Sequence, residues 1–122
     1  MNMNKKTVVI GASPRSDRYS NRAVRMLKKY GHDAIALGFE EATIDGVPIE
    51  TKWGKYENLD TVSLYLNPQR QKQYYDYILN LTPKRIIFNP GTENPELEQL
   101  ARERNILPFE ACTLVLLTTD QY

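Results

Sequence analysis

The sequence contains one cysteine, one histidine and one tryptophan among its 122 residues, and these scarcities exclude several kinds of protein. A single cysteine, Cys112, cannot form a disulfide within the chain, which agrees with a reducing cytoplasm. His32 lies far from Cys112 in the sequence, so a zinc site built from cysteine and histidine has almost no ligands. We therefore expect no metal site.

The sequence also lacks an excess of charge of either sign and has no long apolar run. Sixteen basic and fifteen acidic side chains give a formal net charge of +1, too little to attract nucleic acid or a membrane surface. No run approaches the roughly 20 apolar residues of a membrane-spanning helix. The apolar run near the N-terminus enters a turn after a few residues, unlike a signal peptide. We expect a cytoplasmic protein of one domain, residues 1–122, that binds neither nucleic acid nor membrane.

Short apolar runs alternate with helical patterns along the chain. Five runs predict strands, at residues 7–10, 33–37, 62–66, 85–88 and 107–109. Three helices are predicted, one from Asn21 and two that open with the cap-and-proline pairs Asn67-Pro68 and Asn94-Pro95. Such alternation indicates right-handed crossovers and a three-layer α/β domain, with a mainly parallel five-stranded sheet and helices on both faces.

Two segments fit this pattern less well. Residues 40–60 contain glycines, a proline and only short apolar pieces, which indicates an excursion with a turn or short hairpin. Residues 114–117 form an apolar tail that we expect to pack on the sheet edge.

The turn between the first strand and the first helix, GASPRSDRYSN at residues 11–21, has the composition of an anion site. Ligands of open α/β sheets bind beyond the carboxyl ends of the strands, normally beside the first one. Unpaired N–H groups and the helix dipole make a helix start positive, and three serines with Arg15 and Arg18 add donors. The turn therefore predicts a phosphate site. The alternative is a plain turn capped by Ser20 or Asn21.

The motifs that this turn lacks exclude some classes of phosphate-containing ligand. The dinucleotide fingerprint G-x-G-x-x-G would need glycines where the chain has Ser13 and Ser16, and no G-K-[ST] of a P-loop follows. The second strand ends with Leu37, Gly38 and Phe39 rather than with an acid for a ribose hydroxyl. Glu40 comes just after, and the alternative that it is displaced inward stays open. A carboxylate turned inward there would repel a phosphate on the ribose, so its absence favours a ligand with a phosphorylated ribose.

The stretch VVIGASPRSDRYSNRAVRMLKKYGHDAIAL resembles the opening of the small stand-alone bacterial CoA-binding domain proteins. These are related to the N-terminal CoA-binding domain of the succinyl-CoA synthetase alpha subunit. Later stretches are similar in kind: DGVPIETKWGKYENLDTVSLYLNP, RIIFNPGTENPELEQLARERNI and EACTLVLL. The V-x-G-A-S turn is the specific part. The resemblance implies a Rossmann-like, nucleotide-binding fold that holds coenzyme A or acyl-CoA above the first strand.

The resemblance also implies contact residues. The pyrophosphate would lie on the first turn, the adenosine beside the loop after the second strand, and the pantetheine near the loops after the third and fourth strands. The implied binding residues are Gly11, Ala12, Ser13, Pro14, Arg15, Arg18, Ser20, Asn21, Gly38, Phe39, Asn67, Pro68, Asn89, Pro90 and Gly91. Many relatives have Asn-Pro where this chain has Gly38-Phe39, and an arginine before the proline where it has Asn67, with Arg70 two residues after that proline.

No residue set predicts catalysis. His32 lies in a helix-end turn and is expected to face solvent. Cys112 follows the fifth strand, with no histidine base near it in the sequence. Glu93, Glu96 and Glu98 surround a helix start, where the dipole favours negative charge. We expect a binding module with no catalytic residues of its own.

Two alternatives stay open. The same crevice would suit an NAD(P)-binding domain of the oxidoreductase type, although the broken glycine pattern and the missing acid count against it. A degenerate Rossmann domain would instead act in protein assembly, with Trp53, Tyr56 and the apolar tail as its interface. A homo-oligomer and a separate enzyme subunit are the partners that so small a domain suggests.

Overall fold

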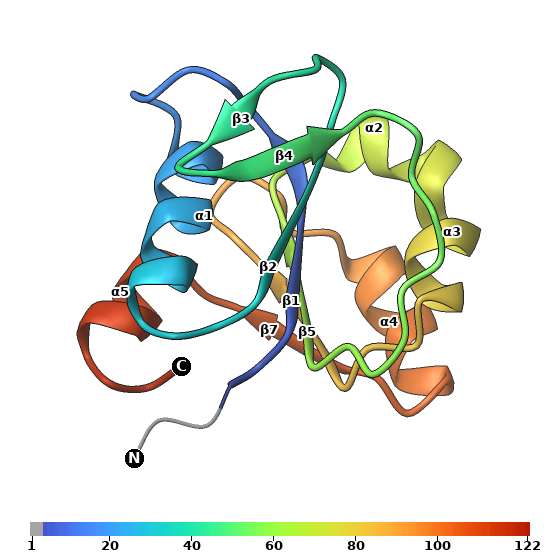
Figure 1. Cartoon of the computed structure of the whole chain (residues 1–122). Helices are drawn as coiled ribbons and strands as arrows, with labels where there is room; N and C mark the ends of the chain where they lie inside the picture. Colours follow the sequence, from blue (N-terminus) through green and yellow to red (C-terminus); the bar gives the residue numbers. More distant parts are fainter. Residues whose placement is uncertain (1–3) are drawn as a thin grey trace.

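The computed structural model describes residues 4–122. A sheet of seven strands forms the middle layer of these residues (Figure 1). The strands are β1 (Thr7–Ala12), β2 (Ala34–Gly38), β3 (Thr43–Ile44), β4 (Val47–Glu50), β5 (Thr61–Leu64), β6 (Arg85–Phe88) and β7 (Leu107–Glu110). Their order across the sheet is β3-β4-β2-β1-β5-β6-β7. Every neighbouring pair is parallel except β3 and β4.

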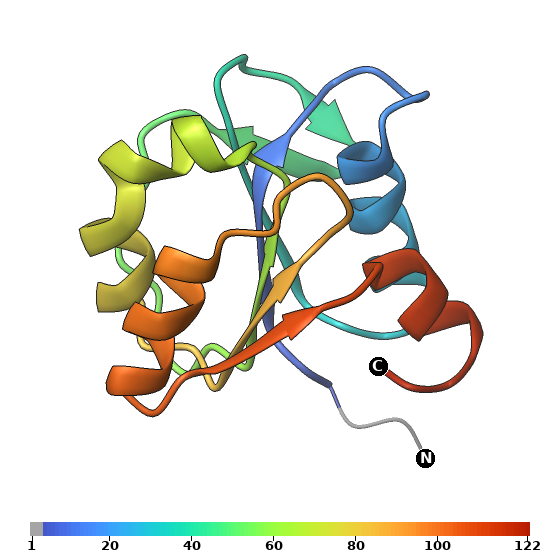
Figure 2. The same cartoon turned by 180° about the vertical axis from the view of Figure 1, so that it is seen from behind.

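Helices cover both faces of this sheet. They are α1 (Tyr19–Lys29), α2 (Pro68–Gln71), the 3-10 helix η1 (Lys72–Tyr74), α3 (Tyr75–Asn80), α4 (Pro95–Glu103) and α5 (Thr113–Thr118). Figures 1 and 2 show α1 and α5 on one face and α2, α3 and α4 on the other. The three-layer α/β architecture with a mostly parallel sheet is therefore confirmed.

The central strand β1 is buried from both sides, which explains its unbroken apolar run. Val8 and Ile10 belong to the core beneath α3 and α4, whereas Val9 packs in the core beneath α1. All three side chains are fully buried. A parallel strand between two helical layers needs apolar residues on both faces, and the sequence supplies them.

The predicted number of strands was wrong. The segment that predicted a turn or short hairpin forms the hairpin β3–β4, which joins the sheet because β4 pairs in parallel with β2. Asp45 and Gly46 connect the two strands, and both have positive φ angles, 48° and 84°. An Asp-Gly pair is a favoured two-residue hairpin turn, so the sequence did carry this signal.

The apolar tail is a helix and not an edge segment. Residues 113–118 form α5, which packs against α1 rather than on the edge of the sheet. The backbone N–H of Thr113 donates to the Asn89 side chain at 2.8 Å, which fixes the start of this helix. An apolar run of this length does not reveal by periodicity whether it is a strand or a helix.

Two predicted helices also differ in detail. The helix after β5 is interrupted by η1, although its predicted cap is confirmed by the Asn67 oxygen, which accepts from the Arg70 N–H at 2.9 Å. Helix α1 begins at Tyr19, earlier than predicted, and its N-cap residue is Arg18, which makes no side-chain cap hydrogen bond. Capping of this helix by Ser20 or Asn21 is therefore wrong.

The sheet edges are poorly suited to pairing with another strand. The Leu107 N–H donates to the Lys84 carbonyl just before β6, and the Ala111 N–H donates to the Phe88 carbonyl at its end. Pro108 of β7 therefore faces the free edge, where it has no N–H to donate. The opposite edge, β3, has two residues. Within residues 4–122, no helix combines the length and apolar character needed to cross a membrane.

Candidate functional site

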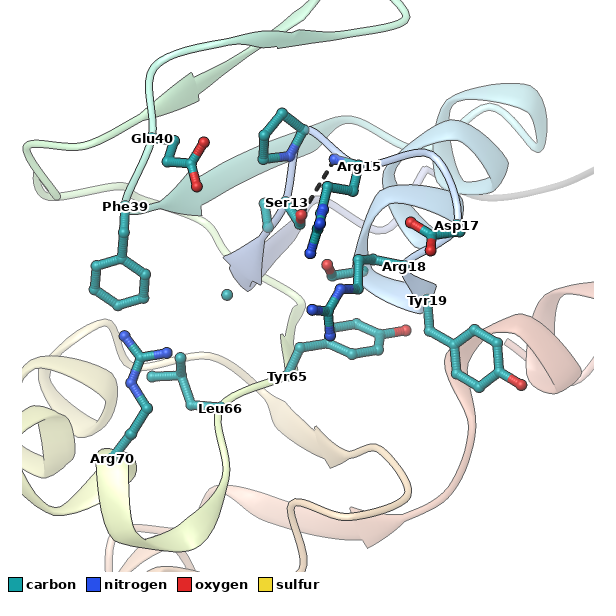
Figure 3. A pocket seen from close by; sticks show the side chains of 14 residues that line it. Ser13, Arg15, Asp17, Arg18, Tyr19, Phe39, Glu40, Tyr65, Leu66 and Arg70 are labelled. Carbon is teal, nitrogen blue, oxygen red and sulfur yellow. Dashed lines mark hydrogen bonds between the residues drawn. The ribbon is translucent and has the colours of Figure 1, made fainter.

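A cavity of about 540 Å³ lies beyond the carboxyl ends of β1, β2 and β5 (Figure 3). Strand β1 stands between β2 and β5, so the order of the strands reverses beside it. This switch point is where open α/β sheets bind their ligands. The cavity is lined by Gly11, Ala12, Ser13, Pro14, Arg15, Asp17, Arg18, Tyr19, Ser20, Phe39, Glu40, Tyr65, Leu66 and Arg70.

The first turn, which the sequence predicts to be a phosphate site, forms one wall of the cavity. A bulge ends β1, with the register shifting between Ile10 and Ala12, and Gly11 there has a φ of 95°. A Cβ atom on Gly11 would lie 3.2 Å from the backbone carbon of Tyr65. Glycine thus permits both the positive φ and the close approach of the chain after β5.

Asn21 shapes this turn from beneath instead of lining the cavity. Its side-chain N–H donates to the Ser13 carbonyl at 2.8 Å, and its oxygen accepts from Arg25 Nε at 2.7 Å. Asn21 is 1% exposed, so this amide ties the turn to α1 inside the protein. Ser20 does line the cavity, at the start of the same helix.

Positive charge collects on the cavity wall without carboxylate partners. Within residues 4–122 the ion pairs are Arg85–Asp60 and Arg102–Glu98, so the arginines of the cavity, Arg15, Arg18 and Arg70, have no acidic side chain within 4.0 Å. Asp17 and Glu40 line the same cavity. The start of α1 adds N–H groups that no side chain caps. This wall can therefore bind an anion through free guanidinium groups, backbone donors and the helix dipole.

An aromatic group stands on the other side of the cavity. Phe39 is 46% exposed, and the Arg70 guanidinium carbon lies 4.3 Å from the centroid of its ring, a cation–π contact. The Trp53 ring is 5.4 Å from Phe39, and Trp53 Nε1 donates to the Gly38 carbonyl at 3.1 Å. The segment between β4 and β5 thus supports the loop that carries Phe39.

Tyr65 forms the floor between these walls. Its hydroxyl is buried and has no hydrogen-bond partner within residues 4–122. Burial raises the pKa of this phenol well above its ordinary value. Tyr65 therefore remains neutral at physiological pH and contributes shape and apolar surface.

The predicted site residues divide into two groups. Those that line the cavity are Gly11, Ala12, Ser13, Pro14, Arg15, Arg18, Ser20 and Phe39. Those that do not line it are Asn21, Gly38, Asn67, Pro68, Asn89, Pro90 and Gly91. Contacts of either group with a ligand stay predictions.

Structural roles account for two residues of the second group. A Cβ on Gly38 would lie 2.4 Å from the Ala12 carbonyl oxygen and 2.8 Å from Ile49, so packing between β1, β2 and β4 requires glycine there. Asn89 donates to Ser63 Oγ and to the Leu64 carbonyl, both at 3.0 Å, and holds α5 through its oxygen. Asn89 thus links three elements inside the protein.

Sequence reasoning missed other cavity residues, namely Asp17, Tyr19, Tyr65, Leu66 and Arg70. The third predicted strand ran to residue 66, but β5 ends at Leu64. Tyr65 follows it, donates its N–H to the Ile10 carbonyl at 2.9 Å and lines the cavity. Glu40 was recognised as the residue after the loop, and the structure places it on the cavity wall.

The other titratable candidates lie elsewhere. His32 was predicted to face solvent, but it is 9% exposed, and its Nδ1 accepts from the Lys5 N–H at 2.9 Å. It precedes β2, at the end of the sheet opposite the cavity. Cys112 is half-buried and does not line the cavity. Among residues 4–122, no three His, Cys, Asp or Glu side chains are grouped to hold a metal ion.

Comparisons with known proteins agree with this fold. The crystal structure of an uncharacterized protein is 45% identical and has a TM-score of 0.96, covering 99% of this chain and 100% of its own. A Thermus thermophilus protein is 20% identical, with a TM-score of 0.83 over 98% of this chain and 91% of its own.

A third similar structure belongs to a larger enzyme. It is the acetyl-coenzyme A synthetase 1 of Candidatus Korarchaeum cryptofilum, in complex with phosphate and ADP, which is 16% identical with a TM-score of 0.68. The alignment covers 88% of this chain and 26% of that one. At such identity it shows the fold alone. Among curated proteins no match is found.

A family model, that of the CoA binding domain, matches residues 5–118. The match extends from just before β1 to the end of α5 and therefore includes the whole sheet and the cavity at its switch point. This agrees with the resemblance carried by the V-x-G-A-S turn. The chain belongs to the CoA-binding domain family.

Proposed function

We propose that the cavity binds coenzyme A or an acyl-CoA, and that the chain acts as a binding module without catalysis of its own. One observation carries this proposal: Arg15, Arg18 and Arg70 line the cavity, and within residues 4–122 none of them forms an ion pair with a carboxylate. The chain's membership of the CoA-binding domain family supports it. Its volume of about 540 Å³ falls within the range of ordinary ligand pockets, roughly 300–1,000 Å³.

The pyrophosphate would lie against the first turn. Gly11, Ala12 and Ser13 bring backbone close to the cavity, and the start of α1 offers N–H groups that no side chain caps. Arg15 and Arg18 point toward the cavity centre in Figure 3. Two charged donors and a helix start together match the two charges of a diphosphate.

The remaining parts of the ligand follow from the other walls. The adenine base would stack beside Phe39, where an exposed ring and the Arg70 guanidinium offer flat faces. The pantetheine arm would leave past Tyr65 and Leu66 toward the loops after β5 and β6. Asn67 lies in the loop after β5, Pro68 is the first residue of α2, and Pro90 and Gly91 lie in the loop after β6. All four are outside the cavity wall.

A role in binding alone agrees with the ionisable groups near the cavity. The phenol of Tyr65 is held neutral by burial, which raises its pKa. His32 lies beyond the opposite end of the sheet, and Cys112 does not line the cavity. Among residues 4–122, those that line the cavity include neither a histidine nor a cysteine, the usual base and thiol nucleophile of covalent catalysis.

The direct test is calorimetry and thermal shift with CoA, acetyl-CoA and dephospho-CoA at up to millimolar concentration. We expect at least one of them to bind and to raise the Tm, because a ligand that binds only the folded state stabilises it. Absence of both heat and stabilisation with all three would overturn the proposal. Equal or larger stabilisation by NAD(H) or NADP(H) would instead favour the oxidoreductase-type alternative.

A further inference from the structure

Glu40 lies where this fold positions a ribose. It follows Phe39 directly, just after the last residue of β2, Gly38. In doubly wound α/β proteins an acid after the second strand accepts hydrogen bonds from ribose hydroxyls. The sequence has Glu40 just after this position and left its inward displacement open, and the structure puts Glu40 on the cavity wall.

The Glu40 carboxylate is available to a ligand. It is exposed to solvent and belongs to neither of the ion pairs found within residues 4–122. In Figure 3 it extends from the loop after β2 toward the first turn, on the same side of the cavity as Phe39. A base that stacks on Phe39 therefore brings its ribose near this carboxylate.

The charges of the cavity favour a ligand with few phosphates. Three arginines and two carboxylates line it, which leaves a formal charge of +1. Arg15 and Arg18 stand at the first turn, and Arg70 lies against the Phe39 ring. A phosphate on the ribose would add negative charge close to Glu40 and would be repelled by it.

From these observations we infer that the cavity selects an adenosine diphosphate-type ligand whose ribose hydroxyls are free. The inference rests on the proposed function and names the ligand more closely: the dephospho form of coenzyme A is bound in preference to coenzyme A. Glu40 sets this specificity by accepting hydrogen bonds from the ribose and by repelling a ribose phosphate. The sequence argument favoured a phosphorylated ribose because it lacked this carboxylate.

Arg70 could favour the opposite preference, for coenzyme A over its dephospho form. Its guanidinium is on the cavity wall and would attract a ribose phosphate if the ribose lay on its side of Phe39. In that case coenzyme A would bind more tightly than its dephospho form. The two arrangements make opposite predictions for the same pair of ligands.

The test is calorimetric titration of the protein with dephospho-CoA and with CoA. We expect dephospho-CoA to bind about tenfold more tightly, a ratio that corresponds to about 1.4 kcal/mol. A second pair, ADP and adenosine 3′-phosphate 5′-diphosphate, should show the same preference, since these compounds differ only in the ribose phosphate.

Variants assign the preference to Glu40. Glu40→Gln should bring the affinity ratio of the two ligands close to one, and Glu40→Lys should invert it. Glu41→Gln and Glu41→Lys are matched controls, because Glu41 is the next residue, is exposed and lines a different cavity beside the β3–β4 hairpin. These controls should keep the ratio of the unmodified protein.

The outcomes separate this inference from the proposed function. If neither dephospho-CoA nor CoA binds, the proposed function is wrong and the inference falls with it. If both bind and CoA is equal or tighter, the proposed function stands and only the inference is overturned. A dephospho-CoA preference that survives Glu40→Lys would also overturn it, because another residue would then set the specificity.

Discussion

The guanidinium carbon of Arg70 lies 4.3 Å from the centroid of the Phe39 ring, so the start of α2 meets the loop after β2 at the cavity. Neither residue is near the other in the sequence. Their contact joins the two sides of the switch point, because β2 and β5 flank β1. Both residues line the cavity, so substitutions in its walls should change ligand binding in measurable ways.

Removing the arginines of the first turn should weaken binding without unfolding the protein. In the double variant Arg15→Ala/Arg18→Ala, dephospho-CoA should bind at least about tenfold more weakly, because hydrogen bonds to charged groups are each worth about 1.5–3 kcal/mol. Calorimetry gives the affinity, and urea denaturation checks the fold. Lys29→Ala/Lys84→Ala removes the same charge from exposed positions remote from the cavity wall and should leave the affinity unchanged. Unaltered affinity in the arginine variant would contradict the pyrophosphate position.

Trp53 should report occupation of the cavity. It is the single tryptophan of the chain, and its ring centroid lies 5.4 Å from that of Phe39. A base stacked on Phe39 changes the surroundings of this ring, so we expect its fluorescence to change during a titration. Phe39→Ala should weaken binding roughly 5- to 150-fold, since stacking contributes about 1–3 kcal/mol per base. A Phe39→Ala variant with full affinity would mean that the base binds elsewhere.

Gly38 should matter for stability more than for ligand contact. In Gly38→Ala the new methyl group would lie 2.4 Å from the Ala12 carbonyl oxygen, and overpacking of this kind costs about 1–3 kcal/mol. Gly54→Ala is the matched control, since its nearest neighbour would be the Tyr56 hydroxyl at 3.8 Å. Urea denaturation compares the two variants. Equal stability of both would show that β1, β2 and β4 can separate at no cost.

His32 should make the protein less stable in mild acid. Burial lowers the pKa of its imidazole below the ordinary value of about 6.5, and the positive charges of Lys5 and Arg85 lower it further. Between the folded pKa and about 6.5, the unfolded chain therefore binds more protons than the folded one, and the free energy of unfolding falls as the pH falls. Urea denaturation from pH 5 to pH 8 should show this slope, and His32→Asn should reduce it. A slope identical in both proteins would rule His32 out as its source.

Much of the fold could be predicted because its signals are local. The β-branched run of β1 and the Asn-Pro caps of α2 and α4 each reflect a few neighbouring residues, and the structure confirms them. Features that depend on tertiary packing were missed. The apolar run of α5 fits a strand or a helix equally well until Asn89 fixes its first N–H.

In the candidate site, too, the residues with a local sequence signal could be predicted and those placed by tertiary packing could not. The first turn could be predicted, since its glycine, serines and arginines are consecutive in the sequence. Tyr65 and Arg70 reach the cavity because β5 ends at Leu64 and α2 turns back toward Phe39, and neither event has a local signal. Glu40 was not among the predicted site residues, because its position on the cavity wall depends on the course of the chain after β2.

A crystal structure of the protein with bound dephospho-CoA tests the central claim most directly. We predict a pyrophosphate against Ser13, Arg15 and the first N–H groups of α1, a base beside Phe39, and ribose hydroxyls facing Glu40. A pyrophosphate bound away from the first turn, for example beside the β3–β4 hairpin where a second cavity of about 530 Å³ lies, would contradict the account.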